Sequence, residues 1–489
     1  MLRDIIIIGS GITGLSTALS LSHHLSSAVP DLRITIFERH FIPSTSGGAI
    51  GLSPVALRYL DHLGVMDELA HLGPEAGADV DGIEVFSART GKSLGQVDFA
   101  GKNGVGIHSD KGPLECQKTY KGARLPRINL TLAMISAVEK RPNIKIVYGK
   151  KLSHVSSLDD EDKVEIHFDD GSRATGDLLL GCDGVHSATR RNFIDPGHEA
   201  EYSGFTLVQS TIPTASLQTS PHFRATSLNF SKSGTMLMTF CDKFHQEMFV
   251  SVMLECREDA VGDYVVVSNE ERKRIIRESL AREVRMRYGD SAIPCIRETV
   301  SRPDIDWMMY PIFQVPLGGR WYTDKAILLG DAAHAMLPRD ESAAYAIDDA
   351  IVLSRVLAEY IAYPLTKAFE VYESMRRDEV THAFKESRKL WKRRNKDAGA
   401  FESWVRERLV PLQLRQTEAS RQAAFKADAS RIEIPSPITR LGTGMGSGQS
   451  SGRSSPASLR PFSKAGSSAS SGSEMMPIGL MDMSGLAMR

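Results

Sequence analysis

The first forty residues contain the feature that most constrains the fold. Residues 5–8 are four consecutive isoleucines that end at a glycine, and such a short, β-branched apolar run predicts a buried parallel strand. Residues 14–25 then carry small and apolar side chains at helical spacing, and residues 34–38 form a second short strand pattern. A strand, a helix and a second strand in this order predict the unit that begins a doubly wound α/β domain.

The turn between the first strand and the helix has the spacing G-x-G-x-x-G. Gly9 permits the tight turn, Gly11 lets the backbone approach a pyrophosphate, and Gly14 lets the helix pack on the strand. The helix start offers free N–H groups and partial positive charge to phosphates. Glu38 closes the second strand, where a carboxylate can accept hydrogen bonds from both ribose hydroxyls of an adenosine. The motif predicts a dinucleotide site. It leaves open FAD or NAD, and the alternative is a tight turn beside a surface glutamate.

Charge and length limit the possible partners. The chain has 489 residues, and 59 Lys+Arg against 60 Asp+Glu leave a formal net charge of −1. Nothing in this balance favours binding to nucleic acid or to a membrane surface. No apolar run is long enough to span a bilayer, and the N-terminal stretch carries an acidic residue and glycines where a signal peptide would be apolar. We expect a protein without transmembrane segments.

The five cysteines are dispersed, with no C-x-x-C pair, which argues against a disulfide framework and a structural zinc site. They are Cys116, Cys182, Cys241, Cys256 and Cys295. We interpret them as buried thiols in a reducing compartment, and therefore expect a cytoplasmic protein without a metal.

The rest of the chain alternates between helical and strand patterns. Alternating apolar residues over 82–99 and 205–256 predict strands of an antiparallel sheet. Helices are predicted over 53–63, 129–138, 270–287, 345–362 and 368–390, with further buried strands at 177–180 and 326–329. The charged run 385–396 is interpreted as the solvated face of a helix, and the alternative is a nuclear-import or anion-binding patch. From residue 434 onward the chain is rich in Ser and Gly and is predicted to be disordered.

Two further strand-to-turn segments decide the kind of dinucleotide. An Asp-Gly turn at Asp183 and Gly184 follows the strand 177–180, and a G-D-A-A-H turn that contains Asp331 follows the strand 326–329. With the first motif, they resemble the three cofactor motifs of the class A FAD-dependent aromatic hydroxylases, the salicylate-hydroxylase-like flavoprotein monooxygenases. Other segments resemble the family in the same order, and the resemblance covers about residues 1–400. These segments are 47–65, 127–130, 307–313, 346–350 and 372–377.

The resemblance implies an α/β fold: a Rossmann-like FAD-binding domain with an inserted antiparallel β-sheet substrate domain and C-terminal helices. The expected division assigns 1–80, 119–200 and 301–365 to the FAD-binding domain, 81–118 and 201–300 to the substrate domain, 366–433 to C-terminal helices and 434–489 to the disordered tail.

The resemblance also implies roles for individual residues. Those implied to bind the pyrophosphate and adenosine ribose are Gly9, Gly11, Gly14 and Glu38. Gly48 and Ala49 are implied to lie against the cofactor, Asp183 and Gly184 to contribute to FAD binding, and Asp331 to bond the ribityl chain. Arg127 is implied to reach the flavin side, and Ala343 and Ala344 to border the isoalloxazine ring. Asp183 and Gly184 are also implied to contact the nicotinamide. No catalytic residue is assigned.

Several residues keep a second interpretation. Asp183 could only cap its turn, and Arg127 could be a surface residue at a helix start. His334 is either an acid/base or, more commonly in such a turn, a residue that orders the loop. Tyr202 and Tyr345 could lie in the core or contact a substrate.

The chain departs from the family at two places. The loop after Pro338 has no glycine and is one residue shorter than the usual Gly-rich loop, which makes close backbone approach to the flavin harder. Many members also carry an arginine that can engage a phenolate, in a Y-x-G-x-x-x-x-R segment, where this chain has Gln209. A phenolate would lack that charge-assisted partner, so phenol hydroxylation is less firmly implied than monooxygenation.

The implied reaction is that of a single-component monooxygenase. NAD(P)H reduces FAD, and the reduced flavin reacts with O2 to a C4a-hydroperoxide that transfers one oxygen to an aromatic or polyketide-like small molecule, in secondary metabolism. The alternatives are an epoxidase of a prenyl or alkene substrate, a halogenase or reductase on the same fold, and a non-catalytic flavin-binding interaction protein. The absence of a W-x-W-x-I-P segment weighs against a halogenase. The oligomeric state stays open.

Overall fold

The computed structural model describes residues 2–45, 47–107, 118–158, 162–232, 234–256, 270–338, 342–395 and 399–437. Cys116, the glycine-free loop at 339–341 and the predicted tail from 438 onward lie outside these residues.

A five-stranded parallel sheet forms the centre of the dinucleotide-binding part, with strand order β18-β12-β1-β2-β8. Its strands are β1 (Asp4–Ile8), β2 (Arg33–Phe37), β8 (Ile144–Val147), β12 (Leu178–Gly181) and β18 (Ala326–Leu328). The isoleucines of β1 are buried, as expected for a central strand covered on both faces. Because β1, β12 and β18 are parallel neighbours, the three motifs that follow them meet at one edge of the sheet.

The predicted helices are present, with ends shifted by a few residues. They are α1 (Ile12–Leu25), α2 (Pro54–His62), α4 (Arg127–Glu139), α6 (Glu270–Tyr288), α9 (Ser342–Glu359) and α10 (Leu365–Asn395). Ser53 caps α2, because its hydroxyl accepts a hydrogen bond from the backbone N–H of Ala56 at 3.4 Å. Short helices not predicted individually are α3 (Val65–His71), α7 (Pro294–Ser301) and α8 (Asp331–His334).

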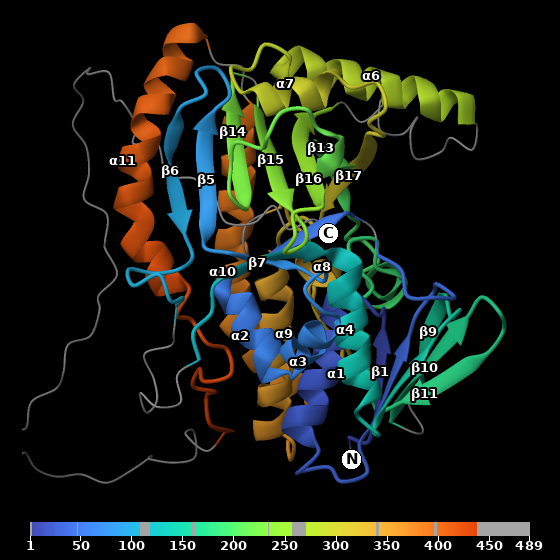
Figure 1. Ribbon diagram of the computed structural model, residues 1–489. Coiled ribbons are helices and arrows are strands. Elements are labelled where there is room, and N and C mark those ends of the chain that lie inside the picture. The colour runs from blue at the N-terminus through green and yellow to red at the C-terminus, as the bar shows by residue number, and fades with distance from the viewer. Residues whose placement is uncertain are drawn as a thin grey trace, which may run out of the picture.

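A seven-stranded sheet forms the second layer and occupies the upper half of Figure 1. In the order β17-β13-β16-β15-β14-β5-β6, its strands are β17 (Met308–Gln314), β13 (Glu201–Pro213), β16 (Glu247–Glu255), β15 (Gly234–Phe240), β14 (Thr226–Ser231), β5 (Gly82–Ser87) and β6 (Ser93–Asp98). All neighbours are antiparallel except β14 and β5, which are parallel. The predicted antiparallel sheet is therefore confirmed, with one parallel pair at which no hairpin sets the direction, because the two strands come from distant parts of the chain.

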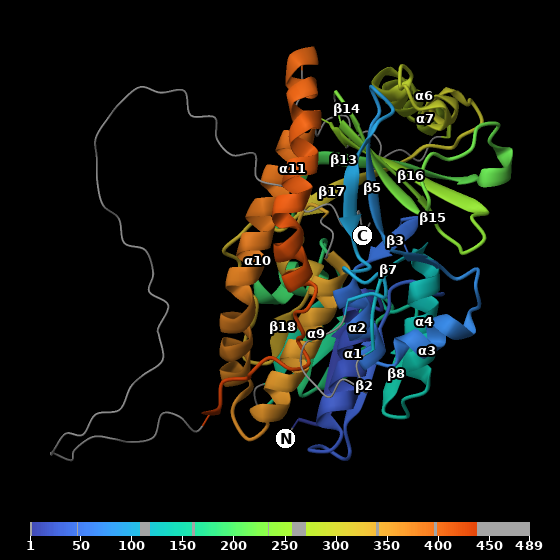
Figure 2. The ribbon, with the colours of Figure 1, turned by 60° about the vertical axis from the view of Figure 1, so that its left-hand side comes forward.

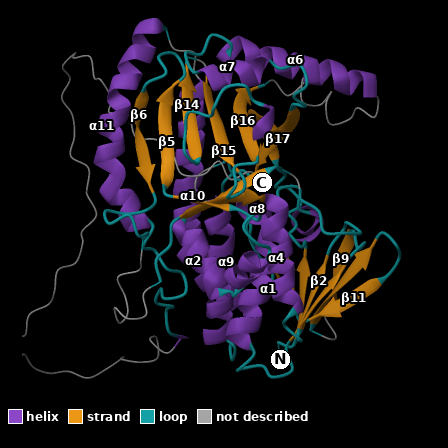
Figure 3. Cartoon of the chain, viewed as in Figure 1, coloured by secondary structure: helices purple, strands orange, loops and turns teal. Residues whose placement is uncertain are grey.

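The two faces of this sheet have different environments. One face packs its apolar side chains, such as Val250 and Met238, with those of α6 and α7 in a separate core. The other face carries Leu207, Phe249 and Leu237, which belong to the large core shared with the parallel sheet. In Figure 3 the strands of this sheet stand above the helices of the dinucleotide-binding part. The second face therefore looks toward the three motifs.

Two small sheets were not predicted. They are β3 (Ala49–Leu52), β7 (Gly122–Pro126) and β4 (Ala78–Val80), and β9 (Leu152–Leu158), β10 (Lys163–Phe168) and β11 (Arg173–Gly176). The first lies where the two layers meet (Figure 1).

Long helices at the C-terminal end cover one side of both layers (Figure 2). α11 (Ala400–Ala424) packs along β6, and Glu407 on this helix accepts a hydrogen bond from the Ser87 hydroxyl at 2.7 Å. After α11, Ile434 packs against the main core and the Tyr360 hydroxyl donates to the Pro435 carbonyl at 2.7 Å. The packed chain thus continues slightly beyond the expected start of the tail at residue 434. Among the described helices, none has the length and apolar character needed to cross a membrane.

Candidate active site

In the glycine turn after β1, two of the three motif glycines have no room for a side chain and the third has open space beside it. Gly9 has φ +100, and a Cβ there would lie 2.6 Å from the Cys182 carbonyl oxygen. A Cβ on Gly14 would lie 1.9 Å from the Gly9 carbonyl oxygen, whereas one on Gly11 would meet nothing within 4 Å. Two glycines are thus required by the protein's own packing. Gly11 faces open space at the start of α1, where a pyrophosphate could approach the backbone.

Glu38 is fixed directly beside this turn. Its Oε2 accepts hydrogen bonds from the Ser10 backbone N–H at 2.9 Å and the Ser10 hydroxyl at 2.8 Å, and its Oε1 accepts from the His40 N–H at 2.9 Å. Burial acts to raise the pKa of Glu38, but these hydrogen bonds outweigh it and leave the pKa below its ordinary value. An ionised carboxylate held in this way retains acceptor capacity for sugar hydroxyls.

Three of the residues predicted to contact the cofactor lie together where the layers meet. The Arg127 backbone N–H donates to the Gly48 carbonyl at 3.0 Å, and Ala49 pairs with Pro126 between β3 and β7. A Cβ on Gly48 would lie 2.6 Å from the Phe249 ring of the seven-stranded sheet. Gly48 is therefore the point where close approach between the dinucleotide-binding part and the sheet excludes a side chain.

Asp183 orders its own turn. Its carboxylate accepts hydrogen bonds from the Ser187 hydroxyl at 2.5 Å and from the N–H and hydroxyl of Thr189 at 2.9 and 3.1 Å. Gly184 beside it has φ +76 and open space around its Cβ position. The turn-capping interpretation thus has direct support, and a contact of this turn with FAD or nicotinamide stays a prediction.

Arg190, which the sequence analysis gave no role, connects the second motif to the third. Its guanidinium is 1% exposed and donates to the Val185, Ala332 and His198 carbonyls at 2.6, 2.6 and 2.9 Å. Val185 lies in the turn after β12 and Ala332 in the turn after β18. A buried arginine shared by both turns holds them in one relative position.

The third turn contacts the first through Gly330. Gly330 has φ +57, and a Cβ there would lie 2.5 Å from the Thr13 hydroxyl in α1. Asp331 follows as the first residue of α8 and is half-buried. All three turns are thus adjacent, as the order of β18, β12 and β1 requires.

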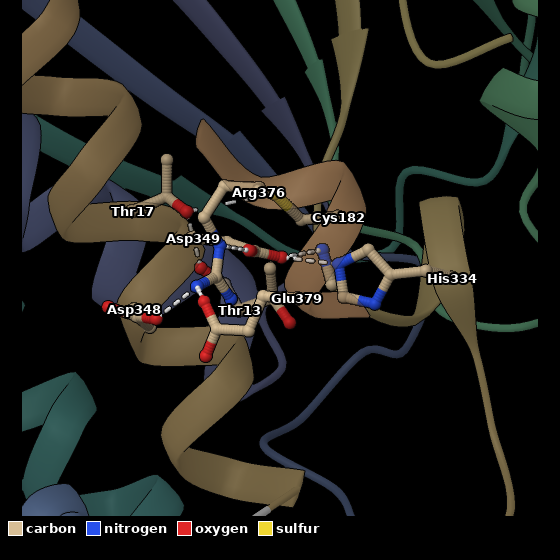
Figure 4. Close-up of polar contacts among 9 residues, drawn as sticks. Thr13, Thr17, Cys182, His334, Asp348, Asp349, Arg376 and Glu379 are labelled. Atoms are coloured by element: carbon tan, nitrogen blue, oxygen red, sulfur yellow. Dashed lines mark hydrogen bonds and ion pairs between the residues drawn. The ribbon is translucent and has the colours of Figure 1, made fainter. Parts of the chain in front are cut away.

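A buried charge network lies behind the third turn (Figure 4). Asp349 in α9 accepts from the Gly330 N–H at 3.0 Å, is paired with His334 Nε2 at 2.6 Å, and accepts from Arg376 Nε at 2.8 Å. Arg376 in α10 also pairs with Asp348, and with Glu379 at 2.6 Å. The two motif-like segments at 346–350 and 372–377 therefore hold the third turn in place.

Asp349 and Arg376 stabilise each other's charged forms. Burial acts to raise the pKa of Asp349, but His334 and Arg376 outweigh it and hold the pKa far below its ordinary range. Burial likewise acts against the charged form of Arg376, and the surrounding carboxylates raise its pKa well above the usual value. His334 is 4% exposed, and its Nε2 is paired with Asp349. This arrangement favours a role in ordering the loop over a role in acid/base catalysis.

Ala343 and Ala344 are buried in the first turn of α9. The sequence analysis placed them in a loop before a helix that begins at 345, so the loop is shorter than expected. Trp391 of α10 anchors the start of this loop, because its Nε1 donates to the Pro338 carbonyl at 2.7 Å. The place of both alanines at a helix start is compatible with the predicted contact to the flavin ring.

Gln209 lies on the face of the seven-stranded sheet that looks toward the motifs. It pairs with Ser251 across β13 and β16, and the next pair on the same face is Thr211 with Phe249, the residues that meet Gly48. Gln209 is fully buried, yet neither its amide nitrogen nor its amide oxygen has a hydrogen-bond partner among the described residues. The Ser251 hydroxyl, also buried, lacks a partner there as well.

The two tyrosines weighed as substrate contacts have partners within the protein. The Tyr202 hydroxyl bonds the Thr206 hydroxyl at 2.8 Å and the Cys256 carbonyl at 3.2 Å. Arg376 lies 5.8 Å from the centre of the Tyr345 ring. Among the described cysteines, Cys182, Cys241 and Cys295 are buried free thiols and Cys256 is half-buried.

The residues present fit FAD. A glycine turn with one open position, an ionised carboxylate beside it and two further turns at the same sheet edge match a dinucleotide with a sugar at each end. The face that carries Gln209 and Ser251 offers neutral donors and acceptors opposite this edge. No chemistry beyond cofactor and small-molecule binding is required to explain these groups.

Comparison with known proteins gives a consistent result. A family model described as "FAD binding domain" matches residues 3–387. Among curated proteins, 6-hydroxynicotinate 3-monooxygenase of Pseudomonas fluorescens is 25% identical over 402 residues, which cover 80% of this chain and 92% of that protein. The 3-hydroxybenzoate 6-hydroxylase of Klebsiella oxytoca is 24% identical over 377 residues, which cover 76% of this chain and 83% of that protein.

Solved structures share the fold. Klebsiella pneumoniae HpxO complexed with FAD and uric acid superimposes with a TM-score of 0.65 at 18% identity, covering 86% of this chain and 96% of that one. CtdE in complex with FAD and a substrate superimposes with a TM-score of 0.63 at 17% identity, and the match covers 86% of this chain and 100% of that one.

Proposed function

The chain belongs to the family of FAD-dependent monooxygenases that share this FAD-binding domain, and from that premise we propose that it uses NAD(P)H and O2 to insert one oxygen atom into a small, electrically neutral ring compound. FAD, when bound, supplies the hydride and oxygen chemistry. The protein supplies binding, orientation and exclusion of water.

The residues at the edge of the parallel sheet are proposed to hold FAD. Gly9, Gly11 and Gly14 form the pyrophosphate turn, and Glu38 accepts the adenosine ribose hydroxyls. The other residues that we assign to the cofactor are Gly48, Ala49, Arg127, Asp183, Gly184, Asp331, Ala343 and Ala344. The proposal is supported by the adjacency of the three turns, through Gly330 against Thr13 and through Arg190.

The substrate class rests on one observation: the buried amide of Gln209 has no partner among the described residues. A buried amide left without hydrogen bonds costs about 1–3 kcal/mol, so the group needs a partner, and a bound ligand can supply one. The amide of Gln209 offers two donors and an acceptor, and the hydroxyl of Ser251 offers one of each, without charge. We therefore assign them to a neutral substrate edge that presents both a donor and an acceptor, such as a lactam or an enol beside a ketone.

The surroundings of Gln209 suit an apolar ring. Leu207 and Phe249 share its face of the sheet and are buried. Apolar walls with a few uncharged polar groups bind a ring by burial and set its orientation by hydrogen bonds. They also exclude water from the reacting atoms.

The proposal is tested by oxygen-isotope incorporation. The FAD-loaded protein is incubated with NADPH or NADH under ¹⁸O2 and a panel of neutral lactams and enolic ring compounds, with charged carboxylate analogues as the matched set. We expect a product heavier by one ¹⁸O atom from a neutral member. Incorporation only into anionic members would contradict the substrate assignment, and no incorporation together with no NAD(P)H oxidation would contradict the enzyme assignment.

Epoxidation of an alkene is the second candidate, because Gln209 provides no cation for a phenolate. An alkene on the same panel distinguishes it, since its product is an epoxide rather than an alcohol. A role in secondary metabolism and a cytoplasmic location stay part of the proposal.

A further inference from the structure

Three histidines come together at a place that the flavin chemistry does not use. His23 and His24 lie in the last turn of α1, and His62 is the last residue of α2. His24 Nε2 and His62 Nε2 are 3.4 Å apart, and one ring nitrogen from each of the three residues lies within 4.8 Å of the others. We propose that these three imidazoles form a binding site for a borderline divalent metal ion such as Zn²⁺, which joins the ends of the two helices.

The spacing of the nitrogens suits metal coordination. Zn–N bonds of 2.0–2.1 Å in a tetrahedral site place two ligand nitrogens roughly 3.4 Å apart, which is the distance between His24 and His62. A single hydrogen bond between two neutral imidazoles accounts for that pair alone. It does not account for the third ring, whose centre lies 4.7 Å from that of His24 and 4.8 Å from that of His62. His23 is exposed, so a rotation of its side chain can bring its nitrogen closer.

The electrostatic setting also accommodates a cation. Both helices end at the cluster, and the last turn of a helix carries partial negative charge on its carbonyls. Charged side chains of both signs lie near the cluster. Arg141 and Arg355 are positive, and Asp61 and Asp428 are negative.

The ligand set indicates the kind of site. Three imidazoles are ligands for Zn²⁺, Cu²⁺ or Ni²⁺ rather than for Mg²⁺ or Ca²⁺, which prefer oxygen. The fourth position would be taken by water. His24 lies 12 residues after the first residue of α1, Ile12, so the cluster is about 18 Å from the glycine turn at 1.5 Å per residue. The ion would therefore act by fixing α1 against α2 and not by contact with the flavin.

The test is a titration of the tag-free, FAD-loaded, chelator-treated protein with ZnCl2, followed by calorimetry and by the melting temperature. We expect one saturable equivalent and a melting temperature that rises with Zn²⁺ concentration. His24→Gln and His62→Gln should each weaken binding by at least about tenfold, since even groups behind a metal ligand contribute that much. The control His154→Gln removes one of two histidines in contact on β9 and β10 and should bind like the wild type.

Retained FAD absorbance and an unchanged melting temperature without Zn²⁺ show that the variants fold. The proposal is overturned if the wild type shows no saturable binding, or if His24→Gln and His62→Gln bind Zn²⁺ as tightly as the wild type. Neither result touches the proposed monooxygenase activity, which is measured separately.

Discussion

Asp349 connects the turn after β18 to the C-terminal helices, because its two oxygens bond two different partners: Oδ2 is 2.6 Å from His334 Nε2 and Oδ1 is 2.8 Å from Arg376 Nε. Each partner lies on a different helix, α8 and α10. A single buried carboxylate therefore couples the third motif to a helix that covers both layers.

Replacing Arg376 by Met should destabilise the protein strongly. The substitution leaves the buried Asp349 and the half-buried Asp348 close together without the guanidinium of Arg376, and removing one partner of a buried ion pair typically costs about 3–5 kcal/mol. Release of FAD on heating, followed by flavin fluorescence, measures the effect. Arg388→Met on the same helix breaks an exposed ion pair with Glu201 at 3.6 Å and should cost no more than about 1 kcal/mol. Equal losses in the two variants would show that the network does not stabilise the site.

Alanine at two glycines of the first turn should separate packing from cofactor binding. A Cβ at Gly14 would lie 1.9 Å from the Gly9 carbonyl oxygen, so Gly14→Ala should unfold at lower temperature even without FAD. Gly11 has open space, so Gly11→Ala should leave the apoprotein stable and weaken FAD binding by about tenfold or more. Apoprotein melting and an FAD titration measure the two effects. Wild-type FAD affinity in Gly11→Ala would mean that the pyrophosphate does not lie there.

Glu38 should contribute to the pH dependence of stability. Hydrogen bonds hold its pKa below the ordinary value of 4.5 despite burial, so the unfolded chain takes up the proton more readily than the folded one. The stability that Glu38 contributes is complete above about pH 4.5 and is lost as the pH falls through its folded-state pKa. Glu38→Gln should flatten this acid limb in urea unfolding, whereas Glu139→Gln, at an exposed site, should not. An unchanged slope in Glu38→Gln would refute this assignment.

Gln209→Leu should stabilise the substrate-free protein and impair turnover. Leucine removes a buried amide that lacks partners among the described residues, which should raise the free energy of unfolding by about 1 kcal/mol or more. For whichever compound takes up ¹⁸O, the variant should show a raised KM. Gln246→Leu, an exposed glutamine between β15 and β16, should change neither quantity. A destabilised Gln209→Leu variant with unchanged KM would contradict the assignment of this amide to the substrate.

Much of the dinucleotide-binding part could be predicted because it depends on local patterns. The isoleucine run predicted β1, and the glycine spacing predicted the turn and α1. Both patterns depend only on the backbone geometry of a few neighbouring residues. Glu38 was found because its distance from the turn along the chain is set by one helix and one strand. The seven-stranded sheet was predicted as alternation, but the parallel pairing of β14 with β5 depends on how distant segments meet.

The interactions that support the site could not be read from the sequence. Asp349 and Arg376 lie 27 residues apart on separate helices, and helical periodicity does not say which charges will face each other. The lack of partners at Gln209 is likewise a property of the packed sheet, because an isolated glutamine in a strand pattern could equally face water. Arg190 closes the second motif, and only the structure shows that it reaches the third turn.

The most direct test of the account is anaerobic reduction of the bound flavin. The purified yellow protein is mixed with NADPH or NADH, each with and without the neutral ring compounds, and the flavin spectrum is followed. The account predicts that the flavin bleaches with at least one nicotinamide, with or without a ring compound, and that its colour returns when air is admitted. A protein that binds FAD but stays oxidised under all of these conditions, or one that cannot be loaded with FAD, would contradict it.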